Sequence, residues 1–431
     1  MSSADRETLE TDVLIVGAGP AGLSCAIRLA DLYAQRGQKF DGVQSAIPGL
    51  PQAVLNPENI FVLEKASEVG AHCLSGALLD PTALRELIPD FESQHPPLQS
   101  PVTHDAVFYL TSQRRFKLPL TLPFLRNHGN YIISLNQFVK WLGSRAEQAG
   151  VSLFCGFSGI EILYEGNRVV GVRTGDKGVD RTGRHKSNYQ PGYDVRARIT
   201  VLAEGVDGSL TKQLVNRLGL NRNRNPQTYA LGVKELWEIP AGRVQKGEVI
   251  HTAGWPLSSR QFGGGFIYAP SETQLSLGLI VGVDDENPGF DPHHAFQQWK
   301  THPWLKHLLE GGQMIRYGAK CIPEGGYFSV PVTVADGTLI IGDAAGFLNP
   351  QHLKGIHLAM KTGMLAADVA YTALVKNDNS ARELGRFEEA WKACIAPITP
   401  AITIPRPDDS HTPCSKKYCV IYEYIFHEAP L

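Results

Sequence analysis

The chain has 431 residues, of which 43% are apolar and 19% are charged, and its formal net charge is −2. This length and balance are typical of one large globular protein or of several interleaved domains, and they argue against a disordered chain. Because the net charge is small, no global field attracts nucleic acid, and any contact with a membrane would need a local patch.

Neither the cysteines nor the N-terminus predict an exported protein. The seven cysteines are scattered and odd in number, which argues against a disulfide framework and for a reducing compartment. No window reaches the roughly 18 consecutive apolar residues that a membrane span needs. The first ten residues have neither the apolar core of a signal peptide nor the Arg-rich composition of a transit peptide. We therefore expect a chain that faces the cytosol or has already been processed.

The first elements form a strand–loop–helix–strand pattern. Residues Thr11–Val16 predict a buried parallel strand, which leads through GAGPAG into a helix at Leu23–Gln35. Arg36–Asn59 is rich in Gly, Pro and Gln and lacks periodicity, so we expect a surface loop. Asn59–Lys65 predicts a second short strand that ends in an acid.

The glycine loop fits a dinucleotide fingerprint, because its three glycines follow a strand and open a helix. Gly17 permits a tight turn, Gly19 lets the backbone approach a pyrophosphate, and Gly22 allows close packing of the helix. Glu64 would accept hydrogen bonds from the adenosine ribose, although it lies about twice as far along the chain as the usual spacing of about 20 residues. The alternative is a Gly-rich turn that binds no ligand.

The middle of the chain predicts further α/β structure and then a β-rich part. The pattern indicates a helix, a hairpin tip and several strands: helix Phe138–Ala149, hairpin tip Thr174–Tyr193, and strands at Val151–Leu153, Glu161–Val172 and Ile199–Ala203. From Tyr229 to Gly282 apolar and polar residues alternate in four segments. These segments predict a mostly antiparallel sheet that forms a substrate domain.

A second segment distinguishes FAD from NAD. The sequence TLIIGDAAGF puts Asp343 directly after a strand and before a helix predicted at Gly355–Val375. Asp343 could accept a hydrogen bond from a ribityl hydroxyl of FAD, and an NAD-binding fold has no need for such a segment so far downstream. The alternative is an Asp in an Asx-turn or a helix cap. A third loop, with Gly205 and Asp207, stands where flavoproteins carry another contact, but alone it would more often be a turn.

Long stretches of the chain resemble electron transfer flavoprotein–ubiquinone oxidoreductase, within the geranylgeranyl-reductase-like flavoprotein superfamily. The resemblance covers residues from about 12 to 391, and it implies FAD as cofactor, electron transfer flavoprotein as donor and ubiquinone as acceptor. The matching stretches include VLEK-x-SEVGAHCLSGALLDP (62–81), NHGNYI (127–132), PQTY-x-LGVKELWEIP (226–240), HTAGWPL (251–257), FGGGF (262–266), LEGGQMIRYGAK (309–320) and LKGIHLAMKTG (353–363).

The resemblance implies a quinone site and a membrane-facing surface. In the family a glycine pair within FGGGF lines the ubiquinone site, which here means Gly263 and Gly264; the residues alone favour a glycine bulge or tight turn. Val69–Asp90 matches the family segment that dips into the membrane surface. Leu118–Leu125 is apolar and would suit a monotopic plateau or a buried loop, with basic residues close by at Arg114, Arg115, Lys117 and Arg126.

The resemblance also implies a C-terminal part with a four-cysteine [4Fe–4S] site, and the cysteine spacing does not match it. Cluster binding uses four thiolates, commonly at short spacings. This region contains only Cys414 and Cys419, with Cys394 some twenty residues upstream. We expect these to be ordinary thiols and the cluster part to be missing. The chain would then be either truncated or misassembled, or a shorter relative that takes electrons another way.

These observations predict an α/β protein with a discontinuous, glutathione-reductase-like FAD-binding Rossmann fold and an inserted, mostly antiparallel quinone domain. The predicted division is 1–90, 138–225 and 333–391 for FAD, 91–137 and 226–332 for quinone, and 392–431 for an irregular tail. The predicted cofactor-binding residues are Gly17, Gly19, Gly22, Glu64, Lys65, Gly205, Asp207, Gly342, Asp343 and Gly355. No metal ligand and no acid–base residue is predicted, and His251 and His357 are interpreted as core histidines.

The predicted function is electron transfer from reduced electron transfer flavoprotein to ubiquinone, at a bacterial or mitochondrial inner membrane. Two alternatives stay open. One is a geranylgeranyl-reductase or hydroxylase-type enzyme that uses NAD(P)H. The other is a flavin-binding remnant without activity, or a partner subunit. Bleaching of the flavin by NADPH would favour the first, and bound FAD without quinone reduction would favour the second.

Overall fold

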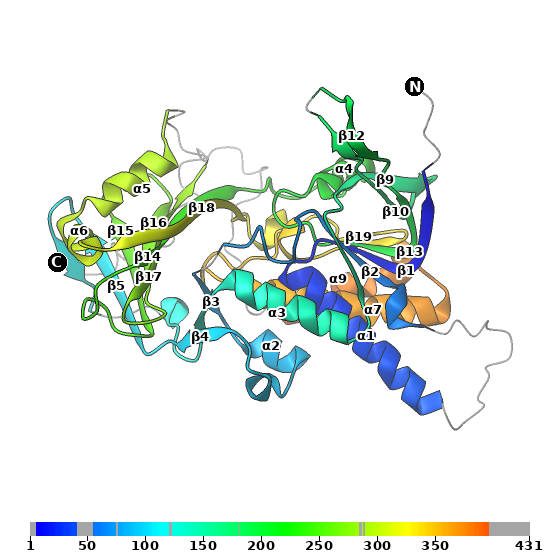
Figure 1. Ribbon diagram of the computed structural model, residues 1–431, viewed down its shortest axis with the longest axis horizontal. Helices are drawn as coiled ribbons and strands as arrows, with labels where there is room; N and C mark the ends of the chain where they lie inside the picture. Colours follow the sequence, from blue (N-terminus) through cyan, green and yellow to red (C-terminus); the bar gives the residue numbers. More distant parts are fainter. Residues whose placement is uncertain are drawn as a thin grey trace.

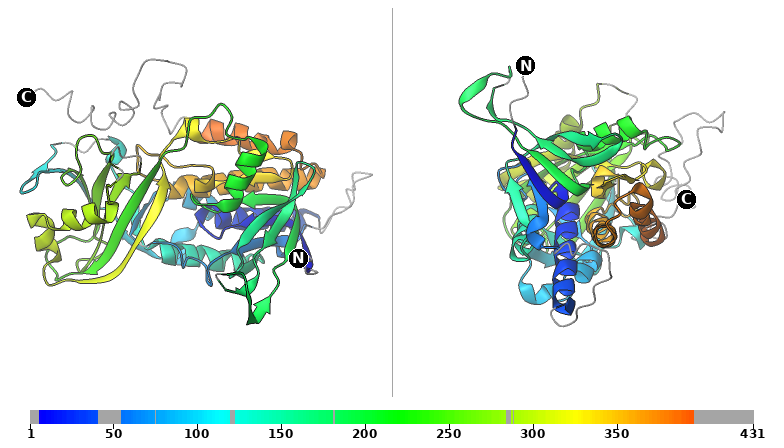
Figure 2. Two further views of the ribbon diagram at one scale, coloured as in Figure 1. Left: turned by 90° about the horizontal axis from the view of Figure 1, so that it is seen from above. Right: turned by 90° about the vertical axis from the view of Figure 1, so that its right-hand side faces the viewer.

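The structure is a computed structural model that describes residues 6–40, 55–74, 76–119, 123–180, 182–283, 287 and 289–395. Two large sheets lie at opposite ends of the molecule, and helices pack mainly around one of them (Figure 1). The left view of Figure 2 shows the same elongated, two-part arrangement from above, and the right view looks along the long axis of the molecule. The cofactor loops belong to the helix-covered sheet, and the predicted quinone residues belong to the other.

The helix-covered sheet has a parallel centre. Its strand order is β19-β20-β13-β1-β2-β8, with β9 and β10 attached at β13. Val13 pairs with Ile60 on one side and with Ile199 on the other, both in parallel register. The bounds are β1 Thr8–Val16, β2 Ile60–Glu64, β8 Ser152–Cys155, β9 Gly159–Glu165, β10 Arg168–Thr174, β13 Asp194–Leu202, β19 Val334–Ala335 and β20 Thr338–Ile340. Continuous apolar runs such as VLIV suit strands that are buried on both faces.

Three long helices pack together beside this sheet. They are α1 (Pro20–Phe40), α3 (Leu135–Gln148) and α7 (Ile356–Lys376), and α1 contacts both of the others. A Cβ at Gly363 would lie 2.2 Å from the carbonyl oxygen of Ala21, so glycine permits the close approach of α7 to the start of α1. The shorter helices are α2 Thr82–Leu87, α4 Ser209–Leu218, α8 Ala381–Leu384 and α9 Arg386–Ile395.

Helix α7 is, among the described residues, the one helix whose length and apolar composition would suffice to cross a membrane. It is 21 residues long, and 72% of its most apolar window is buried inside the protein. It contacts α1, α2 and α9, which gives the helix a protein environment rather than a lipid one. We therefore describe α7 as a core helix.

The other large sheet is mixed, with order β18-β14-β17-β16-β15-β5-β6. Adjacent strands in this sheet pair in antiparallel fashion, except that β15 and β5 are parallel. Helices α5 (Pro292–Lys300) and α6 (Pro303–Leu309) cover one face through a core that contains Trp299 and Leu277. The strand bounds are β5 His104–Leu110, β6 Arg115–Lys117, β14 Tyr229–Glu238, β15 Glu248–Gly254, β16 Gly263–Tyr268, β17 Gln274–Gly282 and β18 Gln313–Pro323.

A small sheet of order β3-β7-β4 packs on the opposite face of the mixed sheet, where Ile132 contacts the cluster of Phe266 and Tyr268. Its strands are β3 Ala77–Leu79, β4 Leu98–Pro101 and β7 Tyr131–Ile133. A hairpin of β11 (Lys177–Val179) and β12 (His185–Gln190) projects from the helix-covered part (Figure 1). Short 3₁₀ turns complete the described elements: η1 Pro57–Asn59, η2 Phe91–Gln94, η3 Pro123–Leu125, η4 Tyr327–Ser329 and η5 Gly342–Ala344.

The elements agree with the expected order, with one correction. Helix α1 continues to Phe40, so the first five residues of the expected loop Arg36–Asn59 are helical; residues 41–54 lie outside the described ranges. The amphipathic pattern extends past Gln35 because no Pro follows and a single Gly37 costs only about 1 kcal/mol in a helix. The expected membrane contact of Val69–Asp90 stays a prediction; within this segment Leu79 and Leu84 are fully buried in the core.

Candidate functional site

The fingerprint glycines form a close strand–turn–helix junction. Gly17 has φ +111°, and a Cβ there would lie 2.3 Å from the carbonyl oxygen of Ala203. A Cβ at Gly22 would lie 2.0 Å from the carbonyl oxygen of Gly17, so these two glycines are required by packing. Gly19 differs, because nothing lies within 4 Å of a Cβ at that position. The open space at Gly19 is where a phosphate could approach the first N–H groups of α1.

Glu64 is held against this loop by backbone hydrogen bonds. Its Oε2 accepts from the N–H of Ala18 at 3.1 Å, and its Oε1 accepts from the N–H of Ala66 at 2.8 Å. The carboxylate therefore keeps a fixed position at the end of β2, next to the glycine loop. The side chain of Lys65 is exposed beside it.

In the third predicted loop, the acidic side chains interact with residues of α4. Glu204 caps α4, because its Oε2 accepts from the N–H of Thr211 at 2.8 Å and from its hydroxyl at 2.9 Å. Asp207 is exposed and lies 3.9 Å from the Nζ of Lys212. Gly205 has φ +76° and no atom within 4 Å of a Cβ position. In this loop, open space for a ligand is therefore found beside the backbone of Gly205. The first N–H groups of α4 are less available, because Glu204 caps them.

The turn that contains Asp343 contacts both α1 and α7. This turn, η5, follows β20, and Gly342, with φ +59°, approaches the start of α1 so closely that a Cβ would lie 2.7 Å from that of Ala21. A Cβ at Gly355, directly before α7, would lie 3.8 Å from the Oδ1 of Asp343. Burial raises the pKa of Asp343 to about 6, against the opposing charge of Lys320. No described residue donates a hydrogen bond to this carboxylate.

A further buried acid, Glu324, was missed by the sequence reasoning. Its Oε2 is buried and has no hydrogen-bond partner among the described residues. Burial raises the pKa of Glu324 to about 8, and the charge of Asp343 adds to the shift. The only sequence signal was a lone acid before two glycines, Gly325 and Gly326, of which Gly326 has φ +67°. Such a signal is too common to identify a site.

Lys234 is a buried cation that the sequence reasoning also missed. It lies on β14, and its Nζ donates to the carbonyl oxygens of Leu74 at 3.1 Å and Gly76 at 3.4 Å. Burial lowers the pKa of Lys234 to about 8. The alternating pattern of a strand predicts which face of the sheet carries the lysine side chain. It does not predict whether another segment of the chain covers that face.

These features fit the ADP and ribityl parts of FAD. Gly19 and Gly205 leave space beside backbone N–H groups, Glu64 is fixed for a ribose, and Asp343 offers a carboxylate without a donor of its own. They come from four loops at the carboxyl ends of β1, β2, β13 and β20. Ligands of open α/β sheets bind at such ends.

The two predicted quinone glycines have different surroundings. A Cβ at Gly263, with φ +151°, would lie 2.2 Å from the carbonyl oxygen of Ile280 and 2.8 Å from Leu257, so this position is filled. At Gly264 only Thr252 lies within 4 Å, with its carbonyl oxygen at 2.6 Å. Both glycines are therefore required by sheet packing, although fewer atoms surround Gly264 than Gly263.

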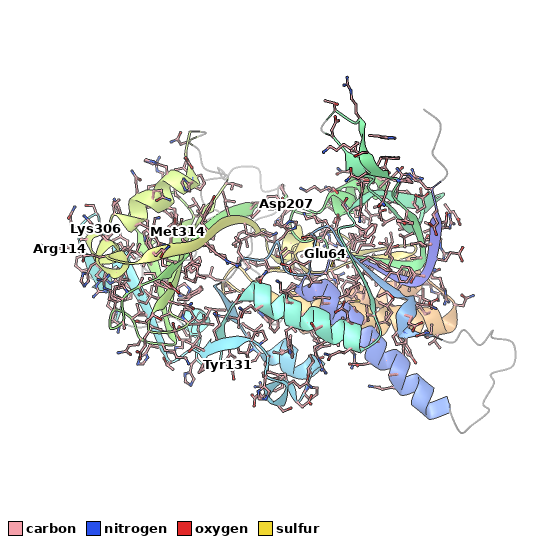
Figure 3. The ribbon with its side chains drawn as sticks, viewed as in Figure 1. Glu64, Arg114, Tyr131, Asp207, Lys306 and Met314 are labelled. Atoms are coloured by element: carbon pink, nitrogen blue, oxygen red, sulfur yellow. The ribbon has the colours of Figure 1, made fainter. Side chains whose placement is uncertain are left out.

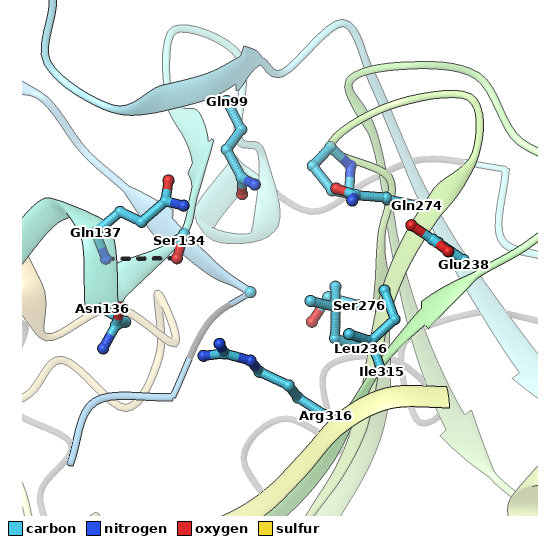
Figure 4. Close-up of a pocket in the computed structure, with 12 residues that line it drawn as sticks. Gln99, Ser134, Asn136, Gln137, Leu236, Glu238, Gln274, Ser276, Ile315 and Arg316 are labelled. Atoms are coloured by element: carbon cyan, nitrogen blue, oxygen red, sulfur yellow. Dashed lines mark hydrogen bonds between the residues drawn. The ribbon is translucent and has the colours of Figure 1, made fainter. Parts of the chain in front are cut away.

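A polar pocket of about 310 Å³ lies between the mixed sheet and the start of α3 (Figure 4). Arg316, Asn136 and Gln137 extend toward it from β18 and α3. It is not the cofactor site, because none of its lining residues belongs to the glycine loops. The lining residues are Gly76, Gln99, Ser134, Asn136, Gln137, Leu236, Glu238, Pro270, Gln274, Ser276, Ile315 and Arg316.

The described part of the chain holds no group of three or more His, Cys, Asp or Glu side chains arranged for a metal ion. Its five cysteines, Cys25, Cys73, Cys155, Cys321 and Cys394, are free thiols. Cys414 and Cys419 lie outside the described residues.

Comparison of the sequence with known proteins finds similarity along most of the chain. A family model for the ubiquinone-binding part of ETF-QO matches residues 229–322. Electron transfer flavoprotein-ubiquinone oxidoreductase of Arabidopsis thaliana is 43% identical over 393 residues, which are 90% of this chain and 59% of that protein. The probable enzyme of Acinetobacter baylyi is 42% identical, over 89% of this chain and 65% of that protein. The chain thus spans about three fifths of the length of these relatives.

Solved structures support the fold. A geranylgeranyl bacteriochlorophyll reductase-like protein from Thermoplasma acidophilum has a TM-score of 0.66 at 21% identity, covering 90% of this chain and 84% of that one. The FAD-dependent halogenase CndH has a TM-score of 0.62 at 19% identity, covering 91% and 81%. Together with 41% identity to the human enzyme over 388 residues, these matches show that the chain is similar to electron transfer flavoprotein–ubiquinone oxidoreductase along most of its length. They also show that it has the α/β fold of the solved structures, with a mixed inserted sheet.

Proposed function

We propose that this chain binds FAD and passes electrons from reduced electron transfer flavoprotein to ubiquinone at a membrane surface. The observation that carries the proposal is the coincidence of two features in one chain. Four loops form a candidate cradle for FAD, and strands β14 to β17 and most of β18 in the mixed sheet lie in the range that matches the ubiquinone-binding family model. Because the chain spans only part of its relatives, their activity is transferred here as a proposal.

The FAD-binding fold would be the discontinuous, glutathione-reductase-like type, with the domain division expected from the sequence. The backbone at Gly17, Gly19 and Gly22 would hold the pyrophosphate, and Glu64 would accept hydrogen bonds from the ribose. Asp343 would accept from the ribityl chain, while Gly205, Gly342 and Gly355 let the backbone approach. Lys65 and Asp207 are exposed and would act only at the rim. When bound, FAD supplies the electron-transfer chemistry.

Ubiquinone would lie on the mixed sheet at Gly264, where the absence of a side chain would let a flat ring approach the backbone. Gly263 would shape this place by allowing the strand to adopt φ +151°. The mixed sheet also ends near the basic residues expected at a membrane. Figure 3 places Arg114 and Lys306 at the same end of the molecule, far from Glu64.

A peripheral position on a bacterial or mitochondrial inner membrane would bring this end to the lipid that contains the quinone. Arg115 supports the local structure there, since its guanidinium stacks on Trp304 at 4.5 Å and on Phe108 at 5.1 Å. Residues 120–122 of the apolar segment lie outside the described ranges. The expected absence of a [4Fe–4S] cluster stays a prediction, because Cys414 and Cys419 lie outside the described residues.

Anaerobic electron transfer with purified, FAD-loaded protein would test the proposal. Reduced electron transfer flavoprotein and a soluble ubiquinone analogue are added, and the flavin absorbance and quinol formation are followed. We expect quinone-dependent reoxidation of the flavin and a visible spectrum with a flavin band. Iron and sulfide analysis of the same sample tests the C-terminal expectation, since stoichiometric iron would contradict it.

The same experiment separates the two alternatives. Rapid bleaching of the flavin by NADPH, with no response to electron transfer flavoprotein, would favour an NAD(P)H-dependent reductase or hydroxylase. Bound FAD without quinone reduction from any donor would favour an inactive remnant or partner subunit. Absence of flavin after loading would remove the basis of all three functions.

A further inference from the structure

Two titratable side chains, His251 and Tyr268, lie near the proposed quinone site and have no role in the features described above. His251 on β15 pairs across the ladder with Phe266 on β16. Because side chains alternate along a strand, Gly264, Phe266 and Tyr268 share one face of β16, and His251 lies on the same face. Both His251 and Tyr268 fall within the range that matches the ubiquinone-binding family model.

The two side chains are hydrogen-bonded to each other. The distance between the Oη of Tyr268 and the Nε2 of His251 is 3.3 Å, and their rings meet edge to face at 5.9 Å. No other described residue accepts from the Tyr268 hydroxyl. A buried hydroxyl needs an acceptor, so Tyr268 is the donor and Nε2 is unprotonated.

This assignment fixes the state of the imidazole. Burial lowers the pKa of His251 to about 4, and the Lys354 ammonium adds to the shift. The neutral ring must then carry its proton on Nδ1. No described residue accepts a hydrogen bond from Nδ1, although the ring is only half-buried. His251 therefore presents a neutral N–H donor whose partner is not supplied by the described chain.

The position of this donor suits a ligand on Gly264. Diagonal neighbours on adjacent antiparallel strands lie roughly 7–8 Å apart, which an imidazole can bridge to a ring that lies over the glycine. Phe266 stands between them in sequence, and its ring stacks on that of Tyr268 at 4.7 Å. The stacking on Phe266 and the hydrogen bond therefore hold the His251 and Tyr268 side chains in one orientation.

The charged groups around the pair come from three other segments. Asp105 on β5 raises the pKa of Tyr268 further beyond the effect of burial, and its carboxylate accepts from the Asn127 side chain at 2.7 Å. Lys354, before α7, is buried and donates to the carbonyl oxygen of His352 at 3.3 Å. Asp80, His352 and His357 surround Lys354, and the Nδ1 of His357 is buried without a partner.

We propose that His251 binds one carbonyl oxygen of the quinone through Nδ1–H and delivers one of the two protons of its reduction, with Tyr268 as the residue that re-protonates the imidazole. The inference rests on the proposed function. Reduction of a quinone to a quinol consumes two electrons and two protons. The Nδ1–H bond breaks as the new O–H bond forms, and Nε2 takes the proton of Tyr268, so the imidazole stays neutral. Before the next turnover Nδ1 takes a proton from water and Nε2 returns its proton to Tyr268, which restores the starting tautomer. The second proton reaches the other oxygen from solvent.

Two variants test the proposal: His251→Gln, which keeps an N–H donor but cannot relay a proton, and Tyr268→Phe, which removes only the hydroxyl. His307→Gln on the exposed surface of α6 is the control. FAD-loaded protein is photoreduced without oxygen, then mixed with decyl-ubiquinone or with ferricenium, which accepts one electron and no proton. The affinity for decyl-ubiquinone is measured separately by fluorescence titration.

We expect quinone reduction to become about 100-fold slower in both variants, as for loss of a general acid, while reduction of ferricenium and FAD content stay unchanged. Tyr268→Phe should bind decyl-ubiquinone almost as tightly as the wild type, and its solvent isotope effect on quinone reduction should change. Unchanged quinone reduction in His251→Gln, or an equal loss with ferricenium, would overturn the proposal. A wild-type protein that reduces ferricenium but neither binds nor reduces the quinone would instead reject the proposed function, and the inference with it.

Discussion

The Oε2 of Glu64 accepts a hydrogen bond from the backbone N–H of Ala18 at 3.1 Å, and this contact joins the end of β2 to the glycine loop. The other carboxylate oxygen accepts from Ala66 at 2.8 Å. Glu64 thus shapes the loop, in addition to its proposed role as an acceptor for a ribose. A fingerprint read from spacing alone describes only the second role.

Replacement of Glu64 by Ala should therefore weaken FAD binding and also loosen the loop. Loss of two charge-assisted hydrogen bonds at a half-buried place should lower the free energy of unfolding by about 1–3 kcal/mol. Glu64→Gln keeps one acceptor oxygen and should lie between the variant and the wild type. FAD content and thermal unfolding of the apoprotein measure the two effects. Glu68→Gln, which alters only a surface ion pair with Lys140, is the control, and equal losses in it would contradict the interpretation.

Asp343→Asn should make FAD binding weaker and less dependent on pH. Burial raises the pKa of Asp343 to about 6, so the ionised acceptor is present above that pH and is lost as the pH falls through it. Wild-type affinity for FAD should therefore decline below pH 6. The variant should bind about ten-fold more weakly at pH 7.5 and show no such decline. Fluorescence titration of apoprotein with FAD between pH 5 and 8 measures this, and a parallel decline in both proteins would contradict it.

Much of the site could be predicted from the sequence, and the reason is local. Gly17, Gly19 and Gly22 follow a strand of continuous apolar residues, and such a strand–turn–helix unit is specified by its own residues. Asp343 was found in the same way, from the pattern around β20. The long matched stretches then identified the family without any structural information.

Other residues could not be predicted because their roles depend on distant parts of the chain. Glu324 is notable because it is buried near Asp343, and Lys234 because its Nζ donates to the carbonyl oxygens of Leu74 and Gly76. His251 is notable because it is hydrogen-bonded to Tyr268. His251 was interpreted as a core histidine, yet its Nδ1 has no acceptor among the described residues. Helix α1 also exceeded its expected end, since propensity marks helix ends less reliably than helix centres.

Glu324→Gln should remove a pH-dependent loss of stability from the apoprotein. Burial and the charge of Asp343 raise the folded-state pKa of Glu324 to about 8, from a reference of 4.5. The protonated form is thus favoured by folding, and its stabilising contribution is lost as the pH rises from about 4.5 through 8. At pH 9 the variant should be more stable than the wild type by roughly 1–3 kcal/mol. Denaturant unfolding at pH 6 and 9 gives the change in the free energy of unfolding with pH for the wild type, for Glu324→Gln and for the exposed control Glu92→Gln. An equal change in all three proteins would contradict the raised pKa of Glu324.

Substitutions at the two glycines of β16 should separate packing from binding. Gly263→Ala should destabilise the protein by about 1–3 kcal/mol whether or not quinone is present, because its Cβ would overlap Ile280 and its φ of +151° disfavours other residues. Gly264→Ala should also lower stability, because its Cβ would lie 2.6 Å from the carbonyl oxygen of Thr252, and it should in addition weaken the affinity for the quinone. Thermal unfolding and decyl-ubiquinone titration are measured on both. A loss of quinone affinity confined to Gly263→Ala would place the ring elsewhere.

The basic end of the mixed sheet should bind anionic lipid. Arg114 and Lys117 are exposed and beside the apolar segment, while Arg115 is stacked on Trp304 and should be left intact for stability. Each basic residue near an anionic surface contributes about 1 kcal/mol, so Arg114→Gln with Lys117→Gln should weaken binding to phosphatidylserine-containing vesicles roughly 30-fold at low salt. The matched control removes two charges from the projecting hairpin, with Arg184→Gln and Lys186→Gln. Sedimentation with vesicles gives the affinities, and the difference should shrink at high salt because the charges are exposed. Equal weakening in both double variants would mean that the attraction is not localised at this end, and a wild-type protein that does not bind the vesicles would remove the membrane contact from the proposed function.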